Sequence, residues 1–376
     1  MKVLLDARQA SNGSGTGRYT TELTRALLES DTDLDLRIVW PRDGADQFEW
    51  LKTDRLVPCS NRASWSGRLN RLRTLRREVL AFKPDLVHFP ANIAGPGAIA
   101  GSGKSKMLLT LHDATFMRDP SWFTRGRAAY YRYAARRSVQ RADRLITDSE
   151  CSATDIRRYL NTAETPIDVI PLGVSEVFTT VTDEDVESIR KKLDLPDRFF
   201  LFVGTLEPRK NLLRVIEAWS SIVADIDTDL VIAGRSGWKT RPMEALLSRT
   251  LHRDRIHRIG FVDDRDLPAL MTAASALVWP SLWEGFGFPP LEAMACGTPV
   301  LTSNLSSFPE VYGDAALLVS PTSVHEIAEG MLRISRDEKL RERLRTQGLE
   351  CAHKYTWRRT AEMTIESYRK TLQSEI

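Results

Sequence analysis

Two glutamates, Glu284 and Glu292, lie eight positions apart, with a glycine-rich turn and two adjacent prolines between them. The apolar run Ala276–Trp279 precedes them, and the helix-like run Leu291–Ala295 begins just before the second glutamate. This order predicts a strand, a tight loop and a helix, with proline at the first helical position, where its missing N–H costs nothing. A helix N-terminus attracts anions, so the two carboxylates would border an anionic ligand that carries hydroxyl groups.

The position of each glutamate predicts a different task. Glu284 would follow a strand at its carboxyl end, which is where ligands bind in open α/β sheets. Glu292 would lie in the first helical turn, where an ionised carboxylate is an acceptor suited to paired hydroxyl groups. Between them, the amides of Phe286, Gly287 and Phe288 would reach further hydroxyl groups.

A second motif carries positive charge. Arg209 and Lys210 follow the apolar run Phe199–Gly204 and precede the helical pattern Leu212–Ile222. Two adjacent cations between a strand end and a helix N-terminus are well placed to hold a pyrophosphate. Taken alone, the pair could equally be a solvated helix cap.

The N-terminal half has two weaker motifs at strand ends. Gly15 and Gly17 belong to a glycine-rich turn after the first apolar run, and such a turn lets backbone amides approach a phosphate or a sugar. This turn lacks the later glycine and the acidic residue of a dinucleotide fingerprint. His112 follows the apolar run Met107–Thr110 and precedes Asp113. A lone histidine in such a place can be a core residue as well as a catalytic one.

The segment from Trp279 to Val300, with its Glu-x7-Glu spacing, its Gly-Phe-Gly-Phe-Pro spacer and the following Cys-Gly-Thr-Pro, resembles glycosyltransferase family 4. These enzymes use nucleotide-sugar donors, retain the anomeric configuration and have the GT-B fold. The resemblance covers essentially the whole chain and is densest in residues 199–320.

The resemblance implies a role for each motif. Lys210 would grip the donor diphosphate, and Arg209 would take the place of an arginine that many members carry just after the glycine, where this chain has Thr205. Glu292 would bind the ribose hydroxyls, and Glu284 would lie beside the transferred sugar.

Further roles follow from the same resemblance. His112 would contact the donor sugar near the bond that breaks, and Gly15 and Gly17 would match the family's glycine loop. The segment Arg258–Val262 would meet the nucleobase largely through backbone groups, with Val262 among the donor-binding residues. Thr147–Glu150 is similar to another loop of the family, for which no role is assigned.

Strands alternate with helices along both halves of the chain, which is typical of parallel sheets covered on both faces. We therefore expect an α/β protein with the GT-B fold: two doubly wound Rossmann-like domains facing across a cleft. Residues 1–172 would form the acceptor-side domain, and residues 173–356 the nucleotide-sugar domain. A C-terminal helix, about 357–376, would pack back on the first domain. The polar stretch from Pro171 to about Pro196 is a plausible linker.

Composition restricts the class of protein. The chain has 376 residues, of which 42% are hydrophobic and 27% charged, and four scattered cysteines. These values are ordinary for a soluble protein of a reducing compartment. The chain has neither a signal peptide nor a run long enough to span a membrane, so we expect a cytoplasmic location.

Charge is unevenly distributed. Residues 1–170 contain 27 Lys and Arg against 20 Asp and Glu, whereas the whole chain has a net charge of +3. The basic stretches Arg62–Arg77 and Arg125–Arg144 contain aromatic residues, which fits a peripheral contact with the inner membrane surface or with a lipid-linked acceptor. They fit a solvated helical face slightly better. No nucleic-acid-binding module is present, so nucleic acid is not an expected partner.

Metal binding is not expected. Asp183-Glu184-Asp185 could suggest an Asp-x-Asp metal motif, but it lies in a polar stretch without a flanking strand, and a solvated turn explains it better. The family resemblance implies the same, since cationic side chains would neutralise the leaving diphosphate. The chain would need no cofactor, because the nucleotide sugar is its substrate.

The motifs look most like those of bacterial mannosyltransferases that build O-antigen or other surface polysaccharides. We therefore expect a retaining hexosyltransferase that moves mannose from GDP-mannose to a glycan or a lipid-linked saccharide. Transfer from UDP-glucose or UDP-N-acetylglucosamine remains open, as does a UDP-sugar epimerase on the same scaffold. A catalytically silent scaffold subunit is a further alternative, although Glu284, Glu292, Lys210 and His112 are all present.

Overall fold

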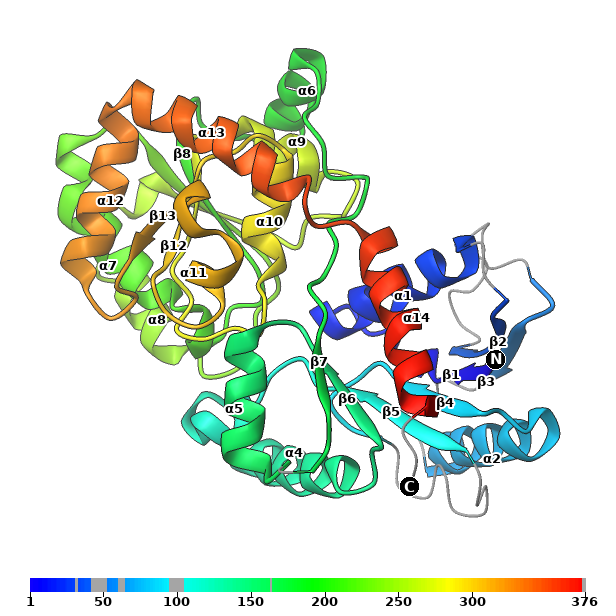
Figure 1. Cartoon of the computed structure of the whole chain (residues 1–376). Coiled ribbons are helices and arrows are strands. Elements are labelled where there is room, and N and C mark those ends of the chain that lie inside the picture. The colour runs from blue at the N-terminus through cyan, green and yellow to red at the C-terminus, as the bar shows by residue number, and fades with distance from the viewer. Residues whose placement is uncertain (31–32, 42–52, 60–64, 95–104, 163, 374–376) are drawn as a thin grey trace. The chain divides into compact units, whose positions relative to one another are not determined.

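The computed structural model describes all residues except 31–32, 42–52, 60–64, 95–104, 163 and 374–376 (Figure 1). Contacts divide the chain into two compact units. The first comprises Met1–Arg118, Arg125–Gly173 and Thr356–Ile376, and the second comprises Asp119–Thr124 and Val174–Tyr355.

The first unit is a seven-stranded parallel sheet with helices on both faces. Its strands follow the order β3-β2-β1-β4-β5-β6-β7, so the chain reverses direction across the sheet between β1 and β4. Its elements are β1 (Lys2–Leu5), α1 (Gly15–Glu29), β2 (Asp35–Pro41), β3 (Leu56–Cys59), α2 (Trp65–Phe82), β4 (Leu86–Phe89), β5 (Lys106–Thr110), α3 (Thr115–Arg118), α4 (Arg125–Val139), β6 (Arg144–Thr147), α5 (Glu150–Leu160), β7 (Ile167–Val169) and α14 (Trp357–Gln373).

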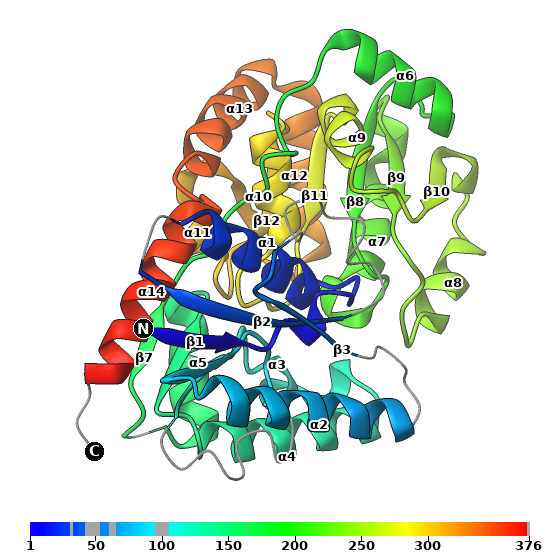
Figure 2. The ribbon, with the colours of Figure 1, turned by 90° about the vertical axis from the view of Figure 1, so that its right-hand side faces the viewer.

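The helices of the first unit explain its apolar strands. In Figure 2, α1 lies on one side of β1 and β2, and α2 and α4 lie on the other. Central strands are therefore buried on both faces, and every residue of β4 is buried. The C-terminal helix α14 packs beside α1, as Figure 1 also shows. The last helix of the chain thus completes the first unit.

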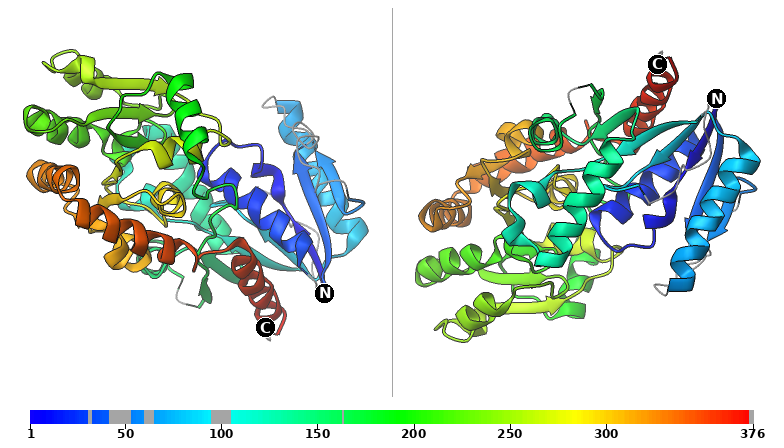
Figure 3. Two further views of the ribbon diagram at one scale, coloured as in Figure 1. Left: turned by 90° about the horizontal axis from the view of Figure 1, so that it is seen from above. Right: turned by 90° about the horizontal axis from the view of Figure 1, so that it is seen from below.

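The second unit repeats this plan with six parallel strands, in the order β10-β9-β8-β11-β12-β13. Helices again cover both faces of the sheet (Figure 3). Its elements are α6 (Asp183–Leu193), β8 (Phe199–Val203), α7 (Leu212–Ile222), β9 (Asp229–Ala233), α8 (Arg241–Leu247), β10 (Ile256–Gly260), α9 (Leu267–Ala273), β11 (Ala276–Trp279), α10 (Phe288–Ala295), β12 (Val300–Ser303), α11 (Phe308–Val311), β13 (Leu317–Val319), α12 (Val324–Arg336) and α13 (Glu338–Ala352).

Three local expectations were wrong. The stretch taken as a linker contains α6, and Asp183-Glu184-Asp185 is the first turn of that helix rather than a solvated turn. The Thr182 hydroxyl and the Asp185 carboxylate form a capping box there, so the acidic residues complement the helix dipole. Strand β3 was not predicted, because Pro58 lies within it and makes the sequence resemble a loop.

The division into units also differs from the expected one: Gly173 and Thr356 belong to the first unit, and a short segment changes unit. Residues 119–124 group with the second unit, although the sequence division placed them in the first. The backbone carbonyl of Trp122 accepts a hydrogen bond of 2.6 Å from Trp238 Nε1, and the Phe123 ring stacks on Trp238. Aromatic packing therefore holds this short segment on the second unit.

Candidate active site

A cluster of charged side chains lies at the carboxyl ends of β8 and β11. These strands are neighbours, and the chain leaves them toward opposite edges of the sheet. Arg209 and Lys210 follow β8, and Glu284 follows β11. Ligands of open α/β sheets bind at such a reversal of strand order. The structure therefore brings together the two motifs that the sequence analysis found separately.

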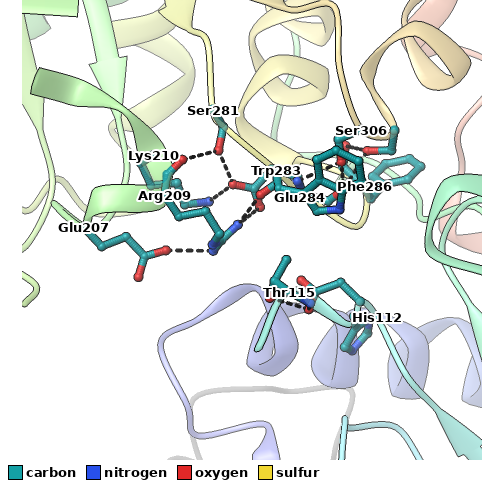
Figure 4. A network of polar contacts seen from close by, with 12 residues as sticks. His112, Thr115, Glu207, Arg209, Lys210, Ser281, Trp283, Glu284, Phe286 and Ser306 are labelled. Carbon is teal, nitrogen blue, oxygen red and sulfur yellow. Dashed lines mark hydrogen bonds and ion pairs between the residues drawn. The ribbon is translucent and has the colours of Figure 1, made fainter. Parts of the chain in front are cut away.

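Glu284 is the centre of this cluster (Figure 4). Its Oε1 accepts hydrogen bonds from Lys210 Nζ at 2.8 Å and from Ser281 Oγ at 2.7 Å. Its Oε2 lies 2.5 Å from Arg209 Nη1, and Arg209 Nη2 donates to Glu207 Oε1 at 2.7 Å. Two cations are thus balanced by two carboxylates.

The backbone around the cluster is fixed by Asn211. This residue has a φ of 65°, in the left-handed region that asparagine tolerates better than most residues. Its Nδ2 donates to the carbonyls of Pro280 and Pro321 at 2.8 and 2.7 Å, and Leu282 N donates to Arg209 O at 2.9 Å. The loops after β8 and β11 are therefore bonded directly to each other.

The cluster sets the charge of its members. Burial alone would raise the pKa of Glu284, but the adjacent Arg209 and Lys210 outweigh it and lower that pKa to about 2. Burial also lowers the pKa of Lys210, although Glu284 opposes this. Glu284 is therefore ionised at neutral pH. An anion that entered the cluster would compete with Glu284 for the two cations.

The turn before α10 is shaped by tight packing. Gly287 has a φ of 98°, and a Cβ there would lie 2.9 Å from the Phe308 ring. Phe286 is 2% exposed and packs edge-on against Tyr355, so its side chain belongs to the core. Helix α10 begins at Phe288, and the next two residues are prolines without an N–H. Phe286 and Gly287 can therefore serve a ligand only through their backbone, whereas the side chain of Phe288 is half-buried.

Glu292 and Val262 also lie near strand ends of the second sheet. Glu292 is 2% exposed and lies beyond the first turn of α10, contrary to the expectation that placed it within that turn. The reason is that the helix begins at Phe288, one residue before the first proline. Val262 follows β10 and its side chain is buried, whereas the preceding Phe261 is exposed.

The glycine-rich turn of the first unit starts α1, with Gly15 as the first helical residue. A Cβ at Gly17 would lie 1.7 Å from the backbone oxygen of Asn12. The turn therefore requires glycine at position 17 for its own close packing, whether or not a ligand binds there.

His112 follows β5 in the first unit and is paired with Asp148. Its Nδ1 lies 2.9 and 3.1 Å from the two carboxylate oxygens, and its ring meets Tyr19 edge-on at 4.6 Å. Burial alone would lower the pKa of His112, but the negative charge of Asp148 and the hydrogen bond outweigh it and raise that pKa. Nε2 is buried and has no hydrogen-bond partner among the described residues. A backbone hydrogen bond with Pro90 also raises the pKa, so protein groups surround the ring.

Behind this pair runs a buried chain of hydrogen bonds. Tyr19 OH lies 3.1 Å from Thr110 Oγ1, which lies 2.8 Å from His88 Nε2. His88 Nδ1 lies 2.8 Å from Tyr368 OH on α14. Burial lowers the pKa of His88 to about 3, so that histidine is neutral. This chain is structural and ties α14 to β4 and β5.

The sequence analysis missed several residues of the two sites. Glu207, Asn211 and Ser281 were not given a role. Asp148 was noted only in a loop without an assigned role. Their signal was their position directly after an apolar strand, since parallel strands end at one edge of the sheet.

Two absences hold for the described part of the chain. No group of three or more His, Cys, Asp or Glu side chains is arranged to hold a metal ion. No helix is long and apolar enough to cross a membrane.

Two family models match the chain. Residues 13–177 match the model for Glycosyltransferase Family 4, and residues 185–350 match the model for Glycosyl transferases group 1. Together they span most of both units.

Curated relatives and solved structures agree with these models. The chain is 29% identical to O-antigen chain mannosyltransferase B of Escherichia coli, over 95% of this chain and 96% of that protein. It is also 29% identical to the serotype-specific mannosyltransferase WbdA of Escherichia coli, over the whole chain but only 48% of that longer protein. In structure it is similar to sucrose-phosphate synthase from Thermosynechococcus elongatus, with a TM-score of 0.80, 20% identity and 98% of each chain covered.

Proposed function

Since the chain belongs to the family 4 glycosyltransferases and has the two Rossmann-like units of the GT-B fold, we propose that it transfers mannose from GDP-mannose. The acceptor would be a hydroxyl group of a glycan or of a lipid-linked saccharide, and the anomeric configuration would be retained. The similarity to O-antigen mannosyltransferases supports mannose as the sugar.

The observation that carries the proposal is the bonding of Arg209 and Lys210 to one carboxylate at the reversal of strand order. In the reaction, the bond between the sugar C1 and the diphosphate oxygen breaks, and a bond from C1 to the acceptor oxygen forms. Negative charge builds up on the leaving diphosphate, and these two cations would stabilise it. The acceptor hydroxyl proton would leave to a phosphate oxygen or to solvent.

Glu284 would have two roles in sequence. Before the donor binds, it neutralises Arg209 and Lys210, which keeps the buried cations paired. Once the diphosphate has replaced it, its carboxylate would be released beside the transferred sugar. As long as Arg209 and Lys210 stay close to it, they keep the pKa of Glu284 low, so that the carboxylate would be ionised and could stabilise positive charge that develops on the sugar. With Arg209 and Lys210 supplying positive charge, the reaction would need no metal ion.

A donor panel tests the proposal. Purified protein would be mixed with GDP, UDP, TDP and ADP, and its melting temperature measured beside that of Lys210→Ala. Ligand at 100 times its Kd should stabilise the protein by about 2.7 kcal/mol. Stabilisation by GDP that is lost in the variant supports the proposed donor. Stabilisation by UDP alone would move the donor to a UDP-sugar.

Product analysis separates the remaining alternatives. A transferase given GDP-mannose and membrane extract releases GDP and forms a mannosylated product, and chelating metal ions with EDTA should not stop it. An epimerase would convert a UDP-sugar into its epimer with no acceptor. A scaffold subunit would bind no nucleotide and turn over no donor, and that result would overturn the proposal.

We also propose that the first unit contacts an anionic membrane surface through α4. This helix has no acidic residue, and Arg125, Arg136 and Arg137 are exposed beside Tyr130 and Tyr133, which are 54% and 68% exposed. Cations and amphipathic rings suit a surface of acidic headgroups. The other basic stretch, from residue 62, lies partly outside the described residues.

Sedimentation with vesicles tests this contact. The protein should pellet with vesicles of phosphatidylglycerol and phosphatidylcholine, but not with phosphatidylcholine alone. Replacing Arg136 and Arg137 by Gln should reduce the pelleted fraction. Equal binding to both kinds of vesicle would contradict an electrostatic contact.

A further inference from the structure

The loop after β12 holds the backbone of Glu284. Ser306 Oγ accepts a hydrogen bond of 2.9 Å from Glu284 N, and it donates a hydrogen bond to Glu284 O (Figure 4). A hydroxyl group has one donor and two acceptor sites, so one serine can satisfy both backbone groups. The N–H and the carbonyl lie on either side of the Glu284 Cα. Bonding both of them therefore fixes the direction in which the side chain leaves the backbone.

Ser306 holds this position at a conformational cost. Its φ of 64° lies in the left-handed region, which serine occupies much less readily than glycine. Glycine would adopt this conformation without strain, but it has no hydroxyl group. Strained backbone of this kind persists where the surrounding structure requires it, and it is concentrated at functional sites. The loop therefore has a hydroxyl group at a position where the backbone conformation favours glycine.

Two further hydroxyl groups hold the rest of the turn that carries Glu284. Ser307 Oγ donates to the carbonyls of Glu284 and Phe286, at 3.2 Å each. Tyr312 OH donates to Gly287 O. Ser307 is fully buried and Tyr312 is 2% exposed, so these bonds lie in the core. The carbonyl groups of the turn are therefore held by the segment that follows β12.

The bonds of the Glu284 backbone differ in kind from those of its side chain. The carboxylate is bonded to two cations, for which an anion would compete. The backbone bonds to Ser306 involve no charged group, so an anion would not compete for them. During an exchange of partners, the Glu284 Cα would therefore stay in place. Such precision matters, because a displacement of about 1 Å near the reacting atoms can cost on the order of 10²-fold in rate.

We infer that Ser306 is a positioning residue for the proposed transfer and that it acts through Glu284. Its hydroxyl group holds the peptide groups on both sides of Glu284, so the carboxylate stays directed at the transferred sugar when its cation partners change. This inference rests on the proposed function, because it needs a sugar beside Glu284. Ser306 itself touches neither the donor nor the reacting atoms in this role.

Two variants separate the hydroxyl group from the backbone strain. Ser306→Gly removes the hydroxyl group and accepts the left-handed conformation, whereas Ser306→Ala removes the hydroxyl group and keeps the strain. The alanine variant should therefore melt at a lower temperature than the glycine variant. Both should lose the same part of kcat, on the order of 10- to 100-fold, because both lack the hydroxyl group. Thermal denaturation and steady-state turnover measure the two quantities.

The assay uses the full chain and does not depend on the identity of the donor. GDP-mannose, UDP-glucose and UDP-N-acetylglucosamine would each be given to wild type with membrane extract. The variants would then be assayed with the donor that wild type turns over. The Kd of the matching nucleoside diphosphate should stay within about twofold of wild type in Ser306→Gly, since Arg209 and Lys210 are unchanged.

A double-mutant cycle tests whether Ser306 acts through Glu284. Adding Ser306→Gly to Glu284→Gln should change the rate by less than about twofold, because the carboxylate that it positions is already absent. A hydroxyl group that acted independently would lower the rate by the same factor in both backgrounds. Single-turnover measurements with the enzyme in excess over the donor make the slow variants measurable.

Ser320→Ala is the matched control. The Ser320 hydroxyl directly follows the next strand, β13, and lies 3.1 Å from Thr322 Oγ1. Its removal should change the rate in neither background.

Three results would overturn the inference and leave the proposed transferase standing. The first is a kcat of Ser306→Gly within about twofold of wild type. The second is a loss of equal size with and without the Glu284 carboxylate. The third is a loss in Ser306→Ala that is absent from Ser306→Gly, since strain would then be the cause. Failure of wild type to turn over any of the three donors would overturn the proposed function and the inference together.

Discussion

Glu284 in the second unit and Asp148 in the first both follow a buried parallel strand, but their partners differ. Glu284 is bonded to two cations and a hydroxyl group, whereas Asp148 is bonded to one imidazole whose other nitrogen has no partner among the described residues. In the second unit, an anionic ligand would compete with a carboxylate for the two cations. In the first, the carboxylate holds one buried imidazole in a fixed orientation.

This difference indicates that only the second unit would depend on an exchange of partners, in which a phosphate group replaces Glu284. In the proposed reaction the cations of the second unit would always have a partner, because either Glu284 or a phosphate group would neutralise them. A buried charge without a partner would be strongly destabilising, so such an exchange would preserve the stability of the second unit in both states. The first unit has one fixed pair, His112 and Asp148. Any contribution of this pair to the reaction would depend on the protonation of His112.

The largest expected effect is on the charged cluster around Glu284. Lys210→Ala removes one of the two cations that would stabilise the leaving diphosphate, so kcat should fall by on the order of 10²–10³. Steady-state assays with GDP-mannose measure it. Lys192→Ala is the matched control, because that lysine pairs with Asp266 on the surface of the same unit. A kcat within twofold of wild type for Lys210→Ala would show that the cluster does not contribute to catalysis.

The second effect is on stability. Glu284→Gln leaves Arg209 and Lys210 without their shared carboxylate, and the free energy of unfolding should fall by about 3 kcal/mol. Urea denaturation measures it, and added pyrophosphate should restore more stability to the variant than to wild type. Glu244→Gln, which breaks a surface pair with Arg258, should cost little. If pyrophosphate stabilised both proteins equally, the proposal that a phosphate group replaces Glu284 would be wrong.

The low pKa of Glu284 also makes the free energy of unfolding depend on pH. Its pKa falls from 4.5 to about 2 on folding, so its contribution is present above pH 4.5 and is lost as pH falls toward 2. The stability difference between wild type and Glu284→Gln should therefore shrink by about 3 kcal/mol between pH 5 and pH 2. Urea denaturation at several pH values checks this, and a constant difference would contradict the pairing.

The third effect concerns the pair of His112 and Asp148. Asp148→Asn removes the charge that raises the pKa of His112, so burial should then lower that pKa. If a protonated Nε2–H serves the reaction, the fall in kcat/KM on the alkaline side should move to lower pH, with about a 10-fold loss at neutral pH. The pH profile is the readout. Asp155→Asn, which breaks a buried pair with Arg118 in the same unit, should leave the profile unmoved.

The smallest effect is on the buried chain of hydrogen bonds that runs from Tyr19 to Tyr368. Tyr368→Phe removes the hydrogen bond to His88 Nδ1, and the free energy of unfolding should fall by about 1 kcal/mol. Thermal denaturation measures it. Tyr133→Phe, on an exposed side chain, should have no effect. A loss of activity without a loss of stability in Tyr368→Phe would give the chain a catalytic role.

The two sites were predictable to different degrees. Glu284 and Lys210 were both found from motifs, and parallel strands explain why they end at one edge, but their direct bond spans 74 positions and depends on strand order. The pairing of His112 with Asp148 likewise joins β5 to β6, and nothing near either residue signals it. Helix α6 and strand β3 were missed because a polar helix and a proline-containing strand lack the apolar pattern that indicates such elements.

The position of α14 has a consequence for biosynthesis. This helix completes the first unit, yet the residues of the second unit, Val174–Tyr355, are synthesised before it. At a ribosomal rate of about 5–20 residues per second, the first unit waits roughly 10 to 40 s for its last helix. Until then the surface that receives Tyr368 is uncovered, and the second unit can fold first although it is encoded later. The first unit is therefore completed only after the whole of the second unit has been synthesised.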